Sequence, residues 1–135
     1  MIVADASVVV DLLLGGPSPA GDALAERLAS REPVAVPHLL DVEVTQVLRR
    51  YVLAGSLPRS QAAALVEELG QLPLIRHGHR PLLARAFELH ANVTAYDAVY
   101  LALAELLEAP LLTADAGLAG VPGCSATVEL VRTGG

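Results

Sequence analysis

The stretch that decides the fold is Thr94-Ala95-Tyr96-Asp97-Ala98-Val99-Tyr100-Leu101-Ala102-Leu103-Ala104-Glu105. Good helix formers fill it, and its only charged side chains belong to Asp97 and Glu105. A helix that is apolar on nearly every face is normally buried in a protein core. Asp97 is then a carboxylate in the first turn of an internal helix, where an unpaired charge is expensive. The rest of the chain must supply Asp97 with a partner: a backbone amide, an arginine or a metal ion.

The composition predicts one compact domain, residues 1–135, without a membrane partner. Hydrophobic residues make up 53% of the chain, yet no apolar run approaches the ~18 residues that a membrane helix needs. The start of the chain has no basic segment ahead of an apolar one, so a signal peptide is not expected. We therefore expect a soluble, cytoplasmic protein. The surplus of apolar residues suits an oligomer or a buried partner interface, and the many alanines are the alternative explanation for it.

The charged residues and the cysteine content exclude several functions. The net charge of -6 argues against a protein that coats nucleic acid, although bound divalent cations would reverse the field of an acidic cleft. All nine basic residues are arginines, which rules out the phosphate-binding loop that ends in Gly-Lys-Ser/Thr. Cys124 is the only cysteine, so a disulfide framework and a cysteine metal cluster are excluded.

Short apolar strands alternate with amphipathic helices along the chain. The strands are expected at 1–5, 34–36, 73–75, 111–115 and 127–131, and the helices at 6–14, 20–30, 38–53, 56–70, 81–90 and 94–108. Residues 133–135 are expected to fray. In the helix at 38–53, one face is shared by Leu40, Val44, Val47, Leu48 and Tyr51, and Glu43 lies at its flank. This alternation predicts a three-layer α/β/α fold with a central, mainly parallel sheet.

Four carboxylates are expected near one rim of this sheet. Asp5 and Asp115 each end a predicted strand, and ligand crevices in such folds lie beyond the carboxyl ends of the strands. Glu43 and Asp97 lie in the first one or two turns of helices that begin near the same rim. Each acid also has a purely structural explanation. Asp5 and Asp115 can cap the helices that follow, Asp97 can form a capping box with Thr94, and Glu43 can be a partly exposed residue at the flank of its helix.

The combination of four acids requires neutralisation, because like charges in one crevice repel one another. Lysine is absent, and no arginine adjoins Asp5, Asp97 or Asp115 in the sequence. An all-oxygen cluster suits the hard cation Mg²⁺, with Mn²⁺ as a substitute, and such ions activate water and stabilise charge on a phosphate. Ser7 and Thr113 are expected to support the acids, with local backbone capping as their alternative role.

Four ordered segments carry a resemblance that spans nearly the whole chain. They are 3–10 with Asp5, 37–50 with Glu43, 94–104 with Asp97, and 112–115 with Asp115. With these segments the chain resembles a PIN-domain ribonuclease, specifically the VapC-like toxin of a VapBC toxin–antitoxin system.

This resemblance implies an Mg²⁺-dependent endoribonuclease that cleaves RNA of the tRNA or rRNA class. It implies that Asp5 and Asp97 are the main metal ligands, and that Glu43 and Asp115 bind a second ion or orient the attacking water. It also implies a homodimer and a cognate antitoxin protein as partners.

Two alternatives stay open. A PIN-like module for binding or dimerisation would need no catalytic acids, although all four are present. Another metal-dependent phosphohydrolase would share the strand-end aspartate, but a haloacid-dehalogenase-like phosphatase needs a second aspartate where Ser7 stands.

Two further groups of side chains are weaker candidates. His77 and His79 have the spacing of a metal-binding pair, with no third ligand nearby. Five arginines could contact the phosphates of a nucleic acid, but they could equally well lie on ordinary solvent-exposed helix faces: Arg49, Arg50, Arg76, Arg80 and Arg85.

Overall fold

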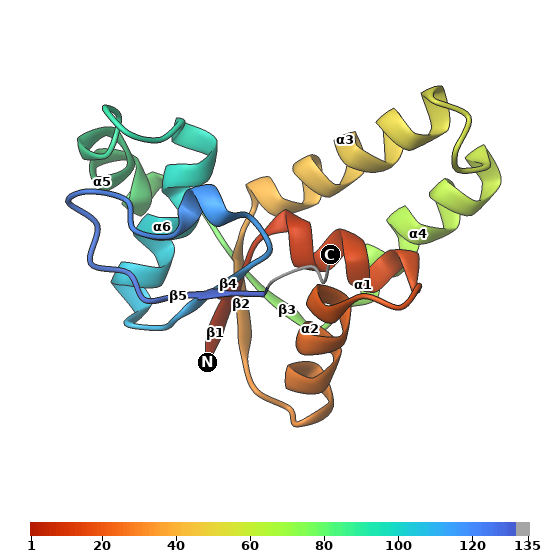
Figure 1. The fold of residues 1–135 in the computed structure, drawn as a ribbon, viewed down its shortest axis with the longest axis horizontal. Helices are drawn as coiled ribbons and strands as arrows, with labels where there is room; N and C mark the ends of the chain where they lie inside the picture. Colours follow the sequence, from red (N-terminus) through yellow and green to blue (C-terminus); the bar gives the residue numbers. More distant parts are fainter. Residues whose placement is uncertain (132–135) are drawn as a thin grey trace.

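A parallel sheet forms the centre of the molecule (Figure 1). The computed structural model describes residues 1–131, so the fraying expected at 133–135 lies outside the described residues. Within residues 1–131 the sheet has five strands in the order β3-β2-β1-β4-β5, and every neighbouring pair is parallel. The strands are β1 (Ile2–Ala4), β2 (Val34–Pro37), β3 (Leu74–His77), β4 (Leu111–Thr113) and β5 (Val128–Leu130).

Helices cover both faces of the sheet. They are α1 (Ala6–Leu14), α2 (Pro19–Ala29), α3 (Leu39–Leu53), α4 (Arg59–Gln71), α5 (Leu83–Glu88) and α6 (Ala95–Leu107), with short 3₁₀ turns η1 (Arg80–Leu82) and η2 (Ala116–Leu118). Figure 1 shows α1 to α4 on one side of the sheet and α5 and α6 on the other. The three-layer α/β/α fold predicted from the sequence is confirmed.

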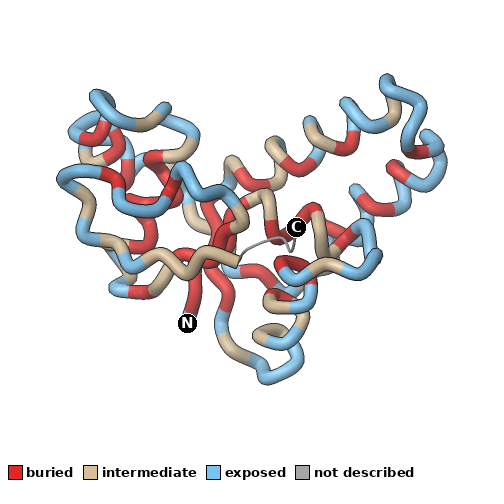
Figure 2. Tube along the Cα trace, in the orientation of Figure 1, coloured by how far each residue is buried: buried red, intermediate tan, exposed pale blue. Residues whose placement is uncertain are grey.

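The inner strands have apolar side chains on both faces because helices cover both. Every residue of β1, β2 and β4 is buried, and Figure 2 shows these strands as a buried centre inside more exposed helices. Residues 98–104 of α6 are all buried as well, and α6 packs on β1, β2 and β4. The helix that is apolar on nearly every face is therefore a core element, as its sequence predicts.

The order of the strands reverses beside β1. The chain adds β2 and then β3 on one side of β1, and later adds β4 and β5 on the other. The carboxyl ends of β1 and β4 thus lie at the switch point of the sheet, which is where open α/β folds form their ligand crevice.

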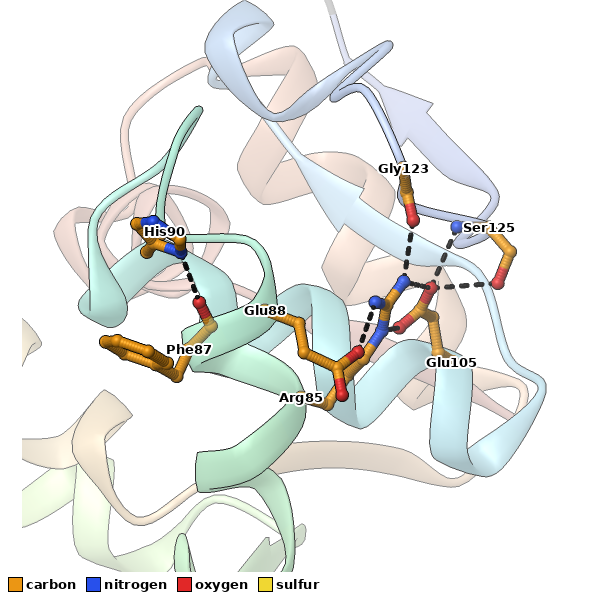
Figure 3. A network of polar contacts seen from close by, with 7 residues as sticks. All are labelled: Arg85, Phe87, Glu88, His90, Glu105, Gly123 and Ser125. Carbon is orange, nitrogen blue, oxygen red and sulfur yellow. Dashed lines mark hydrogen bonds and ion pairs between the residues drawn. The ribbon is translucent and has the colours of Figure 1, made fainter.

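The second charge of the opening stretch, Glu105, has a structural role. Its carboxylate forms a bidentate pair with Arg85 of α5, at 2.7 and 3.0 Å, and accepts hydrogen bonds from the backbone and side chain of Ser125. Arg85 also donates to the carbonyl of Gly123 and pairs with Glu88 (Figure 3). These bonds lower the pKa of Glu105 to about 2, with the Arg85 hydrogen bonds as the largest cause, and they fasten α5 and the 123–125 segment to α6.

Three local predictions were wrong. Strands β1 and β4 end at Ala4 and Thr113 rather than at the aspartates, since the chain turns there and the aspartates accept bonds from the backbone beyond. The predicted helix at 81–90 is a 3₁₀ turn followed by the short helix α5. Tyr51, expected on the buried face of α3, is 38% exposed, because the far end of α3 extends with α4 beyond the sheet (Figure 1).

Within residues 1–131, every helix is too short or too polar to cross a lipid bilayer.

Candidate active site

Asp5 is the most buried of the four acids, with 5% of its surface exposed. It follows β1 and caps α1, where its Oδ1 accepts bonds from the backbone N–H groups of Ser7 (3.0 Å) and Val8 (3.4 Å) and from the Ser7 hydroxyl (2.5 Å). Its Oδ2 accepts a bond of 2.5 Å from the Thr113 hydroxyl. Burial raises the pKa of Asp5, and the four hydrogen bonds oppose that rise. Asp5 therefore caps α1, as its structural explanation predicted, and its carboxylate also contacts the end of β4, while its role as a metal ligand stays a prediction.

Ser7 and Thr113 join the ends of β1 and β4. The Ser7 hydroxyl accepts a bond from the backbone N–H of Ala114 at 3.0 Å, and the Thr113 hydroxyl accepts one from the N–H of Asp115 at 2.9 Å. Each hydroxyl thus donates to Asp5 and accepts from the chain after β4. Local backbone capping, the alternative role, is therefore seen at Thr113, whereas the N–H group that bonds to the Ser7 hydroxyl belongs to Ala114, 107 residues along the chain.

Glu43 reaches the same region from α3. The hydroxyl of the buried Tyr100 donates to its Oε1 at 2.5 Å. Burial raises the pKa of Glu43, and the negative charges of Asp97 and Asp5 raise it further, while the Tyr100 hydrogen bond opposes the rise. Glu43 is therefore close enough to both aspartates to feel their charges, although α3 and α6 belong to different helix layers.

Asp97 lies in the first turn of α6, whose start Thr94 caps through a bond from the backbone N–H of Asp97 (3.2 Å). Burial is the largest cause of the raised pKa of Asp97, and the negative charges of Asp115 and Asp5 raise this pKa further. Asp115 accepts a bond from the N–H of Gly117 at 2.8 Å. Among residues 1–131, no hydrogen bond or ion pair reaches the carboxylate of Asp97, and no arginine pairs with any of the four acids.

The donor set fits a hard divalent cation. All four side chains offer carboxylate oxygens, which Mg²⁺ and Mn²⁺ prefer, and the mutual repulsion of the acids would be relieved by a positive ion. Among the described residues, no three Asp, Glu, His or Cys side chains are close enough to hold an ion by themselves. An ion at this site would therefore take one or two carboxylates directly and keep several waters, which is the usual behaviour of Mg²⁺.

Other candidate side chains have structural partners. Arg76 forms a bidentate pair with Asp41, at 2.8 and 3.1 Å, and Arg85 is paired with Glu105, so neither is free to contact a phosphate. The Nε2 of His79 accepts a bond from the backbone N–H of Leu39 at the start of α3, and among the described residues no group of three potential ligands includes His77 and His79.

Comparison with known proteins shows which family the chain belongs to. The sequence model of the PIN domain matches residues 2–123. The chain belongs to the PIN-domain family. It is 42% identical over 132 residues to Ribonuclease VapC1 of Mycobacterium tuberculosis, an alignment that covers 96% of this chain and 97% of that protein. It is 40% identical over 131 residues to Ribonuclease VapC12 of the same organism, with 97% and 99% covered.

A solved structure shares the PIN fold. VapBC2 from Rickettsia felis, bound to a DNA fragment from its promoter, superposes with a TM-score of 0.70 and covers 96% of this chain and 98% of that chain. The sequence identity is 16%, so this likeness shows the fold alone. The family predicted from the four ordered segments is confirmed.

One group of this PIN-domain site was not predicted from the sequence: the side-chain hydroxyl of Tyr100. The residue was expected only as part of the buried face of α6, yet its hydroxyl is the group that contacts Glu43. A signal was present, because a tyrosine in an otherwise aliphatic buried helix normally finds a hydrogen-bond partner. That partner could not be named from the sequence, since Glu43 lies 57 residues away on another helix.

Proposed function

We propose that this PIN domain is an Mg²⁺-dependent endoribonuclease, with Mn²⁺ as a substitute, and the toxin of a cytoplasmic toxin–antitoxin pair. The observation that carries the proposal is the set of four carboxylates from separate segments at the switch point of the sheet. The raised pKa values of Asp5, Glu43 and Asp97, and the lack of an arginine partner for the four acids among the described residues, support a site built for a cation. The relatives named as ribonucleases support RNA as the substrate.

The acids have different supports, which suggests different roles. Asp5 is held by hydrogen bonds from three residues and is therefore preorganised as a metal ligand. Asp97 is the second ligand, on a rigid buried helix with its carboxylate oxygens available. Glu43 and Asp115 bind a second ion or orient the water that attacks the phosphate. When bound, the metal supplies an activated water and stabilises the charge that develops on the phosphate.

The supporting hydroxyls hold the site together. Thr113 and Ser7 fix the direction of the Asp5 carboxylate and tie it to the segment that carries Asp115. The phenol of Tyr100 holds Glu43 toward α6. Preorganised donors of this kind keep metal ligands in place without a cost at the moment of reaction.

The substrate class and the partners are proposed from the family. We propose single-stranded segments of tRNA or rRNA as the substrate, a homodimer as the working form, and a cognate antitoxin that blocks the acidic crevice. The VapC names of the relatives support an antitoxin partner, because VapBC denotes a toxin–antitoxin system.

The two alternatives are weaker. A purely binding module would not need four carboxylates near one rim of the sheet, because like charges that lie close together repel one another. A phosphatase that forms a phosphoaspartate on Asp5 is disfavoured because such sites normally need a lysine, which the chain lacks, and because Ser7 stands where a haloacid-dehalogenase-like enzyme has its second aspartate.

The test is cleavage of structured RNA by the purified protein. We expect cleavage with Mg²⁺ or Mn²⁺, none with EDTA, and none with Asp5→Asn. Asp22→Asn is the matched control, because Asp22 is an exposed acid in the first turn of α2. Full cleavage in EDTA, or undiminished cleavage by Asp5→Asn, would contradict the proposal.

A further inference from the structure

Tyr96 is an exposed aromatic ring on the helix that carries Asp97. It is 63% exposed, whereas residues 98–104 of α6 are all buried. The whole chain has only three tyrosines, one phenylalanine and no tryptophan. We propose that Tyr96 is a stacking platform for one base of single-stranded RNA, beside the phosphate at the acidic site. This inference rests on the proposed ribonuclease function and adds to it a base-binding subsite.

Helix geometry places Tyr96 next to the acids. It precedes Asp97 by one residue and Tyr100 by four, and residues four apart lie on the same helix face, one above the other. Tyr100 on that face points toward α3 and contacts Glu43. Side chains of a helix tilt toward its N-terminus, so Tyr96 lies one turn further out than the Tyr100–Glu43 contact. It therefore flanks the site at the edge where a bound strand would enter or leave.

The charge of the protein favours a contact that is not ionic. The net charge is -6, and without a bound cation the acids at the site repel phosphates. Three arginines are already paired with carboxylates: Arg27, Arg76 and Arg85. An acidic protein gains little from phosphate neutralisation, whereas stacking of a base on an aromatic ring depends on neither partner's charge.

The other highly exposed ring differs in its surroundings. Phe87 of α5 is 73% exposed, but it already stacks on His90, with ring centroids 5.0 Å apart and an angle of 15° between the planes (Figure 3). Among the described residues, no aromatic side chain stacks on Tyr96. Phe87 is therefore a matched control: an exposed ring of similar size that lies on a different helix.

The experiment measures binding of a short, fluorescently labelled single-stranded RNA by anisotropy, with Ca²⁺ replacing Mg²⁺ so that binding is recorded apart from cleavage. The variants are Tyr96→Phe, Tyr96→Leu and Phe87→Ala, each at low and high salt. We expect Tyr96→Leu to weaken binding about tenfold, since it keeps an apolar side chain but loses the ring. We expect Tyr96→Phe and Phe87→Ala to bind like the wild type, and the loss in Tyr96→Leu to be the same at both salt concentrations.

A second measurement identifies the base. The same RNA is prepared with abasic sites at successive positions, and one abasic position should weaken wild-type binding while leaving Tyr96→Leu unaffected. The inference is overturned if Tyr96→Leu binds like the wild type, if Phe87→Ala loses as much, or if every abasic position affects both proteins equally. Because binding is measured without cleavage, failure of the ribonuclease proposal would appear separately, as wild-type protein that binds RNA but does not cut it with Mg²⁺.

Discussion

The hydroxyl of Tyr100 lies 2.5 Å from Oε1 of Glu43 and joins α6 to α3, two helices from opposite layers of the fold. Tyr100 is 2% exposed, and the pKa of its phenol is raised by burial and by the bond to Glu43. The phenol therefore stays protonated and donates to the carboxylate. In this way the helix that carries Asp97 also sets the position of Glu43.

Tyr100→Phe tests this positioning role. The substitution keeps the buried ring and removes only the hydroxyl, so we expect a loss of about 1 kcal/mol in the free energy of unfolding. Because Glu43 loses its donor, we expect kcat for RNA cleavage to fall about tenfold, which corresponds to 1.36 kcal/mol, while KM for RNA is unchanged. Tyr51→Phe, on the exposed end of α3, is the control. Equal changes in kcat and KM, or no change, would argue against a positioning role.

Thr113→Val tests the link between Asp5 and Asp115. Thr113 is fully buried, and its hydroxyl both donates to Asp5 and accepts from the N–H of Asp115. Valine has nearly the same shape, so we expect a destabilisation of about 1–3 kcal/mol from the unsatisfied groups together with reduced RNA cleavage. Thr45→Val is the control, because the exposed Thr45 hydroxyl donates to the carbonyl of Asp41 in its own helix. Urea unfolding that gives the two variants the same stability would contradict this account.

Asp97→Asn should stabilise the protein when divalent metal is removed. Burial and the charges of Asp115 and Asp5 raise the pKa of Asp97, so the folded chain binds this proton more tightly than the unfolded chain. Ionisation of Asp97 therefore costs stability as pH rises above the unfolded value of about 3.9. In EDTA we expect a higher Tm for Asp97→Asn than for wild type at neutral pH, and a difference that disappears near pH 4.

Added Mg²⁺ should make the wild type more stable than Asp97→Asn, the reverse of the order expected in EDTA. An ion that binds the folded, ionised site stabilises the wild type by mass action, and we expect little effect on Asp97→Asn. Thermal unfolding at several pH values, with EDTA or with Mg²⁺, measures both effects. A variant that is less stable than the wild type in EDTA at neutral pH would show that Asp97 has a favourable partner within the protein.

Glu105→Gln should weaken the fold without changing the chemistry of the site. The pKa of Glu105 is about 2 in the folded protein, so its stabilising contribution is present above the unfolded value of about 4.3 and is lost as pH falls toward 2. We expect the variant to be less stable by about 1 kcal/mol at neutral pH, with a difference that shrinks in acid. RNA cleavage at saturating substrate should be unchanged at low temperature; a large fall in kcat there would connect the Arg85–Glu105 pair with the reaction.

The sequence predicted the convergence of Asp5 and Asp115 for a reason that is general. The carboxyl ends of parallel strands share one edge, so residues that follow two such strands meet even though they are far apart in the chain. Thr94 and Asp97 were predictable for a local reason, because a capping threonine fixes the helix start within one turn.

Contacts between separate elements could not be predicted in this way. Arg76 was a candidate for phosphate contacts, but it pairs with Asp41, 35 residues away on α3. The pairing of β3 with β2, the strand that leads into α3, brings the two side chains together. The exposure of Tyr51 also depends on how α3 packs against the other elements, which the sequence pattern of α3 does not show. Its helical face was identified correctly, but helical periodicity does not show where the core under that face ends.

The most direct test of the central claim, that the strand-end acids bind a divalent cation, is a titration of Mn²⁺ followed by the electron paramagnetic resonance signal of the free ion. The account predicts that wild-type protein and Asp22→Asn remove the free signal with equal affinity, that Mg²⁺ competes, and that Asp5→Asn and Asp97→Asn each bind Mn²⁺ much more weakly. Equal binding by all four proteins would place the ion elsewhere, and RNA cleavage by a wild-type protein that binds no Mn²⁺ or Mg²⁺ would contradict the metal-dependent mechanism.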